Sequence, residues 1–327
     1  MSARTWLRGW RGTLLMVVWP SLIGAPLAAQ AAVNRDPGRV RLVTEDIPRF
    51  WRALDGATLL NAADRLQRIY VDSGTAGLQG FLRGRIVSGR GLAGTVASRP
   101  RFYESIRNAT MAIDSAPETR SAIRASLERL AALYPDAVFP DVYFLIGRLN
   151  SGGTTGPAGL LIGAEMYARG PETPLDELSG WERAVTGSAE AVPWIVAHEL
   201  IHYQQPQLQG AVTLLSQSLK EGAADFVGEL ISGGMINRVQ HEYGDAHEAA
   251  LWEEFRGAMA GTELGAWLYQ GDASKDRPAD LGYWMGYKVA KAYYDRSPDK
   301  AAALRRILTQ SDPEAFLAES GYRGGAR

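Results

Sequence analysis

The residues best suited to chemistry in this chain of 327 residues are two histidines and the glutamate between them, in the run His198-Glu199-Leu200-Ile201-His202. Histidines four apart on a helix project from one face and can hold a single metal ion. With Glu221, which follows in the next predicted helix, they form the two-nitrogen, one-carboxylate set of a catalytic zinc site that leaves the fourth position open for water. We therefore predict zinc as the cofactor, bound by His198, His202 and Glu221.

The chemistry of such a site assigns a different role to Glu199. Bound zinc lowers the pKa of a water ligand from about 15.7 towards about 7, so that hydroxide becomes available near neutral pH. Glu199 lies about 100° round the helix from His198, which makes it a poor ligand but places it beside the metal. It is the expected general base.

Both motifs predict amphipathic helices that face each other across the metal. At about 100° per residue, Glu199 shares one arc of its helix with the two histidines, and apolar side chains fill the opposite side. Around Glu221, one face carries the polar residues Ser218, Asp225 and Glu229. The first helix is thus expected to bury its apolar face and to present its polar face to the metal.

These motifs resemble those of the gluzincin metallopeptidases, the thermolysin-like and aminopeptidase-N-like enzymes, in which a second helix supplies a glutamate ligand. The resemblance implies that Asp225, one turn after Glu221, orients a zinc histidine from the second shell of the site. The runs 282–287 and 141–147 are similar to those of a bacterial family of predicted zinc-dependent proteases related to gliding-motility lipoproteins. This second resemblance covers most of the mature chain.

One segment departs from the aminopeptidase pattern. The run Gly163-Ala164-Glu165-Met166-Tyr167 is similar to the Gly-x-Met-Glu-Asn segment whose glutamate captures a substrate's amino terminus, but Glu165 comes one residue early. In a strand, a displacement by one residue turns the side chain to the opposite face. Aminopeptidase specificity is therefore not indicated, and a structural role for Glu165 is equally open.

The resemblance also implies a tyrosine or histidine donor that stabilises the oxyanion of the tetrahedral intermediate. Tyr283 and Tyr287 lie one turn apart on a helix predicted over 281–294, and Tyr294 follows on the same side. Gly282 and Gly286 would allow this helix to approach another element closely. An aromatic stripe at helical spacing is also typical of a core, so both roles stay open for Tyr283 and Tyr287.

Two further histidines, His241 and His247, are flanked by acidic residues and are expected at the surface. Neither is needed to complete a three-ligand site. His241 is the next candidate for the oxyanion donor if neither tyrosine serves.

Residues 1–31 are typical of a secretory signal peptide. Arg4, Arg8 and Arg11 precede an apolar run that ends in Ala29-Gln30-Ala31, a small-x-small cleavage pattern. The alternative is an uncleaved anchor, but proline and glycine interrupt a run already shorter than the roughly 20 residues needed to cross a bilayer. We expect an exported protein, periplasmic or secreted, with no stable membrane span after cleavage.

Composition excludes several classes of protein. The chain has no cysteine, which rules out a lipobox, disulfides and thiolate metal sites. Basic and acidic side chains number 35 and 36, and removal of the three arginines of the signal leaves a small acidic excess, so nucleic acid is not an expected partner. The sequence does not indicate an oligomeric state.

The fold is expected to be α+β and zincin-like, with a mostly helical portion over 32–135 and a metal-binding catalytic portion over 136–327. Helices are predicted over 44–54, 59–70 and 115–134, and another follows the cap at Ser311-Asp312-Pro313-Glu314. The aromatics Trp51, Phe81, Phe102 and Tyr103 are expected in the core. Apolar strands are predicted at 142–146 and 159–163, separated by a Gly/Ser/Thr-rich loop at 150–156. The segment 160–166 either pairs with an extended substrate or belongs to a supporting hairpin.

The function predicted from these features is hydrolysis of peptide bonds, in peptide or protein substrates, by an exported zinc endopeptidase. The alternative is a non-catalytic metal-binding protein of the cell envelope that binds a partner through the cleft. The presence of Glu199 favours the enzyme, because zinc binding alone needs no base at that position.

Overall fold

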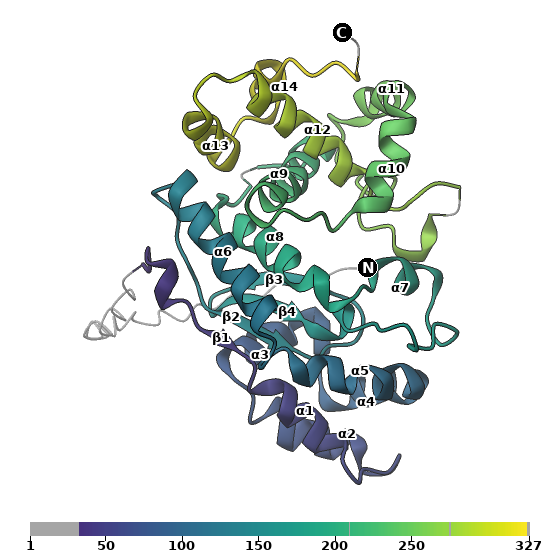
Figure 1. The fold of residues 1–327 in the computed structure, drawn as a ribbon. Coiled ribbons are helices and arrows are strands. Elements are labelled where there is room, and N and C mark those ends of the chain that lie inside the picture. Colours follow the sequence, from purple (N-terminus) through teal and green to yellow (C-terminus); the bar gives the residue numbers. More distant parts are fainter. Residues whose placement is uncertain (1–32, 209, 275, 326–327) are drawn as a thin grey trace, which may run out of the picture. The chain divides into compact units, whose positions relative to one another are not determined.

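Helices dominate the structure, a computed structural model in which residues 33–325 other than 209 and 275 are described (Figure 1). The predicted signal peptide, residues 1–31, lies outside the described residues. From Asn34 onwards the chain forms one compact unit. Within the described residues, a four-stranded sheet completes the α+β fold that the sequence predicts.

The sheet has the strand order β1-β2-β4-β3, with β1 at Leu42–Val43, β2 at Val142–Leu145, β3 at Gly153–Gly156 and β4 at Gly159–Gly163. β1 pairs parallel with β2, and β2 pairs parallel with β4. β3 pairs antiparallel with β4, Thr154 opposite Leu161. The predicted strands β2 and β4 are confirmed. They are fully buried, as expected of strands covered on both faces.

The loop expected at 150–156 is wrong, because this segment contains β3. β3 and β4 form a hairpin, so the supporting-hairpin alternative is confirmed for β4, whereas β2 and β4 are parallel neighbours. β4 is hydrogen-bonded on both sides and ends at Gly163, so its backbone has no free edge for a substrate. The two edge strands are β1 and β3, and β3 is the one that contacts α8.

The N-terminal helices pack around aromatic side chains. They are α1 (Asp46–Leu54), α2 (Ala62–Arg65), α3 (Ala76–Phe81), α4 (Gly89–Ser98), α5 (Pro100–Ala112) and α6 (Pro117–Leu133). A π-helical stretch, Leu66–Val71, continues α2, and a second irregular stretch, Leu82–Ile86, follows α3. Phe50 meets Trp51 and Tyr70 edge to face. All four aromatics expected in the core are buried there.

The C-terminal helices carry the residues of interest. They are α7 (Gly180–Val185), α8 (Val192–Gln204), α9 (Leu214–Ser232), α10 (Arg238–Ala246), α11 (Glu248–Ala258), α12 (Leu281–Arg296), α13 (Lys300–Thr309) and α14 (Pro313–Ser320). A capping box of Thr213 and Ser216 begins α9, and Gly233 ends it at a φ of 79°. Asp312 caps α14, as the sequence predicts.

α8 lies between the sheet and α9 (Figure 1), and α6 contacts it as well. The polar face of α8 is therefore buried as well: the side chains of His198 and Glu199 are each only 5% exposed. α9 in turn packs on α12. The predicted portions 32–135 and 136–327 meet directly, because β1 of the first pairs with β2 of the second.

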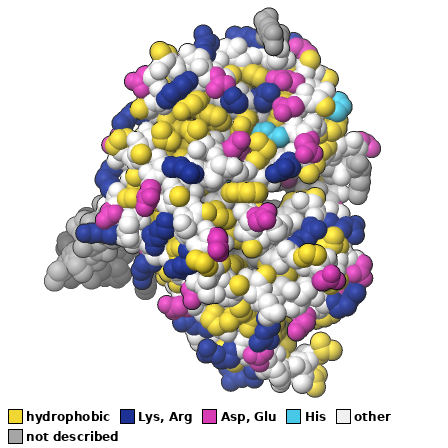
Figure 2. Space-filling model, viewed as in Figure 1, with side chains coloured by type: hydrophobic (Ala, Val, Ile, Leu, Met, Phe, Trp, Pro, Cys, Tyr) yellow, Lys and Arg dark blue, Asp and Glu magenta, His cyan; other side chains and the backbone are white. Residues whose placement is uncertain are grey.

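The surface in view in Figure 2 carries acidic and basic side chains interspersed with apolar ones, without a large area of one sign. No helix among the described residues is long and apolar enough to cross a bilayer.

Candidate metal centre

The two histidines of α8 and the glutamate of α9 converge on one small volume, as the sequence predicts. The Nε2 atoms of His198 and His202 lie 3.0 Å apart. The Oε2 atom of Glu221 lies 3.0 Å from Nε2 of His202 and 3.7 Å from Nε2 of His198. Among the described residues, these three side chains form the cluster able to hold a metal ion.

The geometry of this cluster fits zinc. Ligand atoms held 2.0–2.1 Å from a tetrahedral zinc lie about 3.3 Å from one another, and the three observed separations bracket that value. Two imidazole nitrogens that face each other at 3.0 Å cannot both be bare lone pairs, so the arrangement calls for a cation or a proton between them. The donor set of two nitrogens and one carboxylate oxygen is one that zinc prefers.

The outer nitrogen of His198 faces Asp225. Nδ1 of the ring lies 2.8 Å from Oδ1 of the carboxylate, and Asn237 donates from Nδ2 to the other oxygen, Oδ2, at 2.6 Å. Both side chains of the first pair are buried. Asp225 therefore occupies the orienting position that the resemblance implies, and Asn237 in turn holds Asp225.

The outer atoms of the other two ligands are held as well. Nδ1 of His202 lies 2.7 Å from Oε1 of Gln205, whose amide nitrogen donates to the carbonyl of Lys220. Oε1 of Glu221 accepts hydrogen bonds from Tyr269 at 2.8 Å and from Gln217 at 2.9 Å. Each ligand thus has a partner that fixes its orientation, which is typical of metal sites.

The electrostatics of the cluster are those of a site that exchanges protons for a metal. Burial lowers the pKa of His202, but the Glu221 carboxylate at 3.0 Å opposes it and raises that pKa to about 9. Burial raises the pKa of Glu221, but His202 opposes it and brings that pKa down to about 2. A proton on His202 then compensates the buried carboxylate, and metal binding has to release it.

Glu199 lies outside the ligand cluster and beside the edge strand β3. A Cβ built on Gly153 would come within 2.6 Å of Cγ and Oε1 of Glu199, so this glycine leaves room for the carboxylate. Burial raises the pKa of Glu199, while the charges of His202, His198 and Arg85 lower it. Glu199 therefore lies between the metal ligands and a strand with a free edge.

The two candidate donor tyrosines have different surroundings. The ring of Tyr283 stacks on His198, with centroids 6.3 Å apart and planes inclined by 24°. The hydroxyl of Tyr287 instead donates to Oε2 of Glu229 at 2.6 Å, and its ring packs against His241 and Phe226. The structure thus brings Tyr283 to the ligands and directs the hydroxyl of Tyr287 to Glu229.

The expectation for His241 is wrong. Its side chain is 7% exposed and meets the ring of Tyr287 edge to face at 4.4 Å, because α10 turns that side towards α12. His247 is exposed, as expected.

Four residues of the site were missed in the sequence. Gln205 lies three residues after His202 and Gln217 four before Glu221, and these spacings place each on the same helix face as its ligand. That local signal was available. Tyr269 and Asn237 carry no such signal, since loops far along the chain bring them to Glu221 and Asp225.

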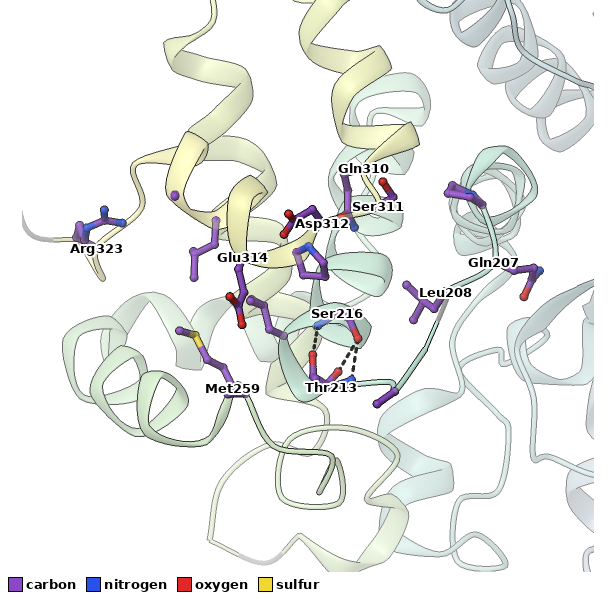
Figure 3. Close-up of a pocket in the computed structure, with 17 residues that line it drawn as sticks. Gln207, Leu208, Thr213, Ser216, Met259, Gln310, Ser311, Asp312, Glu314 and Arg323 are labelled. Carbon is purple, nitrogen blue, oxygen red and sulfur yellow. Dashed lines mark hydrogen bonds between the residues drawn. The ribbon is translucent and has the colours of Figure 1, made fainter.

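A sizeable cavity lies away from this cluster. It measures about 660 Å³ and is lined by the loop after α8, the start of α9, the end of α11 and the start of α14, including Leu208, Met259 and Asp312 (Figure 3). The capping hydrogen bonds between Thr213 and Ser216 are drawn at this cavity. Neither Glu199 nor any of the three ligands lines it.

Comparison with known proteins agrees with the geometry of the cluster. Residues 184–317 match the model of a family described as "Predicted Zn-dependent protease (DUF2268)", and this range includes the three ligands, Glu199, Asp225 and the candidate tyrosines. No curated protein and no solved structure matches the chain significantly. The resemblance to the predicted zinc-dependent proteases is therefore confirmed for the part of the chain that carries the metal-binding cluster.

Proposed function

We propose that this protein is an exported zinc-dependent endopeptidase. The observation that carries the proposal is the convergence of His198, His202 and Glu221, whose nearest ligand atoms lie 3.0–3.7 Å apart, with a second glutamate, Glu199, beside them but not among them. The family description supports the protease class. Export rests on the signal-like residues 1–31 of the sequence.

Zinc in this site would supply a Lewis acid that activates water and polarises the scissile carbonyl. Glu199 accepts the proton of the attacking water and delivers it to the amine that leaves when the carbon–nitrogen bond breaks. Asp225 and Gln205 hold the two imidazoles in a fixed orientation throughout. Burial of Glu199 excludes bulk water from the proton that it transfers.

β3 is the element best placed to bind the substrate backbone. Its outer edge is unpaired within the sheet, and its residue Gly153 contacts Glu199. An extended peptide that adds to this edge by main-chain hydrogen bonds would run past the base and the metal ligands. Such binding recognises backbone over several residues, which suits an endopeptidase.

The surroundings of Glu165 support the same choice. Its side chain is 0% exposed, and its Oε1 accepts a hydrogen bond from the backbone of Leu149. Its carboxylate contacts Gly147 and Leu149, which precede β3, and it cannot reach a substrate's amino terminus. The capture of an amino terminus by Glu165 is therefore not part of the proposal.

The test combines metal analysis with cleavage of a mixed peptide library. The purified chain should bind one zinc, and His198→Ala and His202→Ala should lose it, while His247→Ala, at an exposed histidine, should retain it. Glu199→Gln should keep the zinc and lose about 10²–10⁴-fold in turnover, because the amide cannot accept a proton.

Two results would overturn the proposal. Full zinc content in both histidine variants would show that the cluster is not the metal site. Zinc binding without cleavage of any peptide, by parent and Glu199→Gln alike, would favour a non-catalytic envelope protein that uses the metal for stability or for a partner.

A further inference from the structure

Arg85 is connected to the edge strand that runs beside Glu199. It lies in the irregular stretch after α3, and its Nε donates to Oγ of Ser151 at 3.0 Å. Oγ of Ser151 donates in turn to the carbonyl of Gly153 at 3.0 Å, and Gly153 contacts Glu199. The side chain of Asn150 donates to the carbonyl of Arg85, which ties the two segments together a second time.

The charge of Arg85 has no carboxylate partner. Its side chain is half-buried, yet no acidic group among the described residues lies within 4 Å of its guanidinium. Two other partly buried arginines, Arg49 and Arg99, do contact carboxylates, at Asp46 and Glu182. A cation that gives up part of its solvent without an ion pair costs free energy, and a substrate carboxylate bound at this position would offset that cost.

The shape of the guanidinium indicates what that partner is. Ser151 occupies Nε, and the described residues provide no hydrogen-bond acceptor for the two Nη groups. These groups present parallel N–H bonds in a fixed fork that matches the two oxygens of a carboxylate. The guanidinium of Arg85 lies over the ring of Phe81, with Cζ 5.7 Å from the ring centroid, which limits its movement.

The charge interaction between Arg85 and Glu199 also indicates that Arg85 lies near the catalytic centre. Burial lowers the pKa of Arg85, and the charge of Glu199 opposes that change. The two side chains therefore lie within electrostatic reach of each other without forming an ion pair.

We propose that Arg85 is a specificity-determining residue that binds a carboxylate of the peptide substrate at the end of β3. The inference rests on the proposed peptidase function. The carboxylate belongs either to an aspartate or glutamate side chain or to the substrate's C-terminus, since the fork recognises both.

The experiment uses three synthetic peptides and two readouts. One octapeptide carries a single internal glutamate and a C-terminal amide, the second replaces that glutamate by glutamine, and the third is the glutamine peptide with a free C-terminal carboxylate. Binding is measured by calorimetry on the zinc-loaded Glu199→Gln protein, and kcat/KM on the parent sequence.

Arg85→Met keeps an unbranched apolar side chain at this position and removes the guanidinium with its charge. We expect it to lower binding and kcat/KM about 10- to 100-fold for a carboxylate peptide and to leave the all-amide glutamine peptide nearly unchanged. Loss confined to the glutamate peptide identifies a side-chain carboxylate, and loss confined to the free-acid peptide identifies the C-terminus. The matched control is Arg83→Met, at an exposed arginine two residues earlier, which should change none of the three.

A structural brace would behave differently. If Arg85 only supports β3, Arg85→Met and Ser151→Ala will weaken all three peptides equally, and the proposal is then overturned. It is also overturned if the parent does not distinguish carboxylate from amide. Should the parent cleave no peptide, the proposed hydrolysis fails separately, and the binding ratios alone decide the role of Arg85.

Discussion

Gly222 on α9 and Gly286 on α12 lie backbone against backbone. A Cβ built on Gly222 would fall 2.0 Å from the backbone nitrogen of Tyr287 and 2.1 Å from the carbonyl carbon of Gly286. Gly222 follows the metal ligand Glu221 directly, so this close contact between the helices also helps to set the position of the ligand. The expectation that glycine lets α12 approach another element closely is thereby confirmed.

Gly222→Ala should destabilise the protein by about 1–3 kcal/mol, because two backbones would have to separate. The midpoint of urea unfolding measures the change. Gly94→Ala is the control: this glycine is also helical, but a Cβ there meets nothing within 4 Å, so helix propensity should make the change neutral or slightly stabilising. Equal effects of the two substitutions would contradict the close packing of α9 and α12.

The partners of the ligands should govern zinc affinity. Gln205→Ala and Asn237→Ala should each weaken zinc binding roughly 10- to 100-fold, since they release the orientation of His202 and of Asp225. Competition with a chromophoric chelator gives the affinities. The control is Gln79→Ala. Gln79 lies on α3 and donates a hydrogen bond to the backbone of Val71, so its loss should leave zinc affinity unchanged. An unchanged affinity in Gln205→Ala and Asn237→Ala would show that the ligand side chains keep their orientation without these partners.

Three tyrosine-to-phenylalanine variants separate the roles near the metal. Tyr287→Phe leaves Oε2 of Glu229 without its donor and should cost about 1 kcal/mol in stability, with little effect on turnover or zinc. Tyr269→Phe removes a donor from the ligand Glu221 and should weaken zinc binding. Thermal unfolding and zinc titration together measure both effects.

Tyr283→Phe tests the oxyanion role directly. Tyr283 stacks on His198, and burial raises the pKa of its phenol well above the ordinary value, so its hydroxyl stays protonated and able to donate. If it stabilises the oxyanion, the variant should lose turnover while zinc content and melting temperature stay the same. Full turnover would assign Tyr283 to packing.

Glu165 should make stability depend on pH. Burial raises the pKa of its carboxyl from 4.5 to about 7, against the opposing hydrogen bonds from the backbone of Gly147 and Leu149. Between these two values the folded protein holds a proton that the unfolded chain has released, so the contribution of Glu165 falls as pH rises from about 4.5 to about 7. The total is on the order of 3 kcal/mol.

Urea unfolding of the parent and of Glu165→Gln across pH 4 to 9 isolates this contribution. The variant should gain stability relative to the parent as pH rises through that interval, and the difference should level off above about pH 8. A difference that does not change with pH would mean that the carboxyl titrates alike in both states.

The ligands were predictable because their spacing is local. His198 and His202 are one helical turn apart, and Glu221 lies on a polar face that the wheel of its own segment shows. The long helices α6 and α12 were predictable for a similar reason: their apolar periodicity extends over many turns.

What could not be predicted depends on contacts between distant segments. Gly153-Thr154-Thr155-Gly156 has the composition of a turn, and only pairing with β4 makes it a strand. The parallel pairing of β2 with β4 is likewise set by the path of the chain and not by either strand's residues. The acidic residues that flank His241 predict an exposed ring, whereas the ring packs against Tyr287 of α12.

The order of the sheet also bears on how such a protein can diversify. β2 and β4 pair with each other, yet the chain between them leaves the sheet's interior, forms the edge strand and returns. Segments that connect two strands already fixed by their own pairing tolerate insertions and substitutions at little cost to folding. Gly153 has to stay a glycine, because it leaves room for Glu199. The turn at residues 157–158 between β3 and β4 can change in length and sequence while the helices that carry the metal ligands stay the same, so that new substrate preferences can evolve on an unaltered catalytic centre.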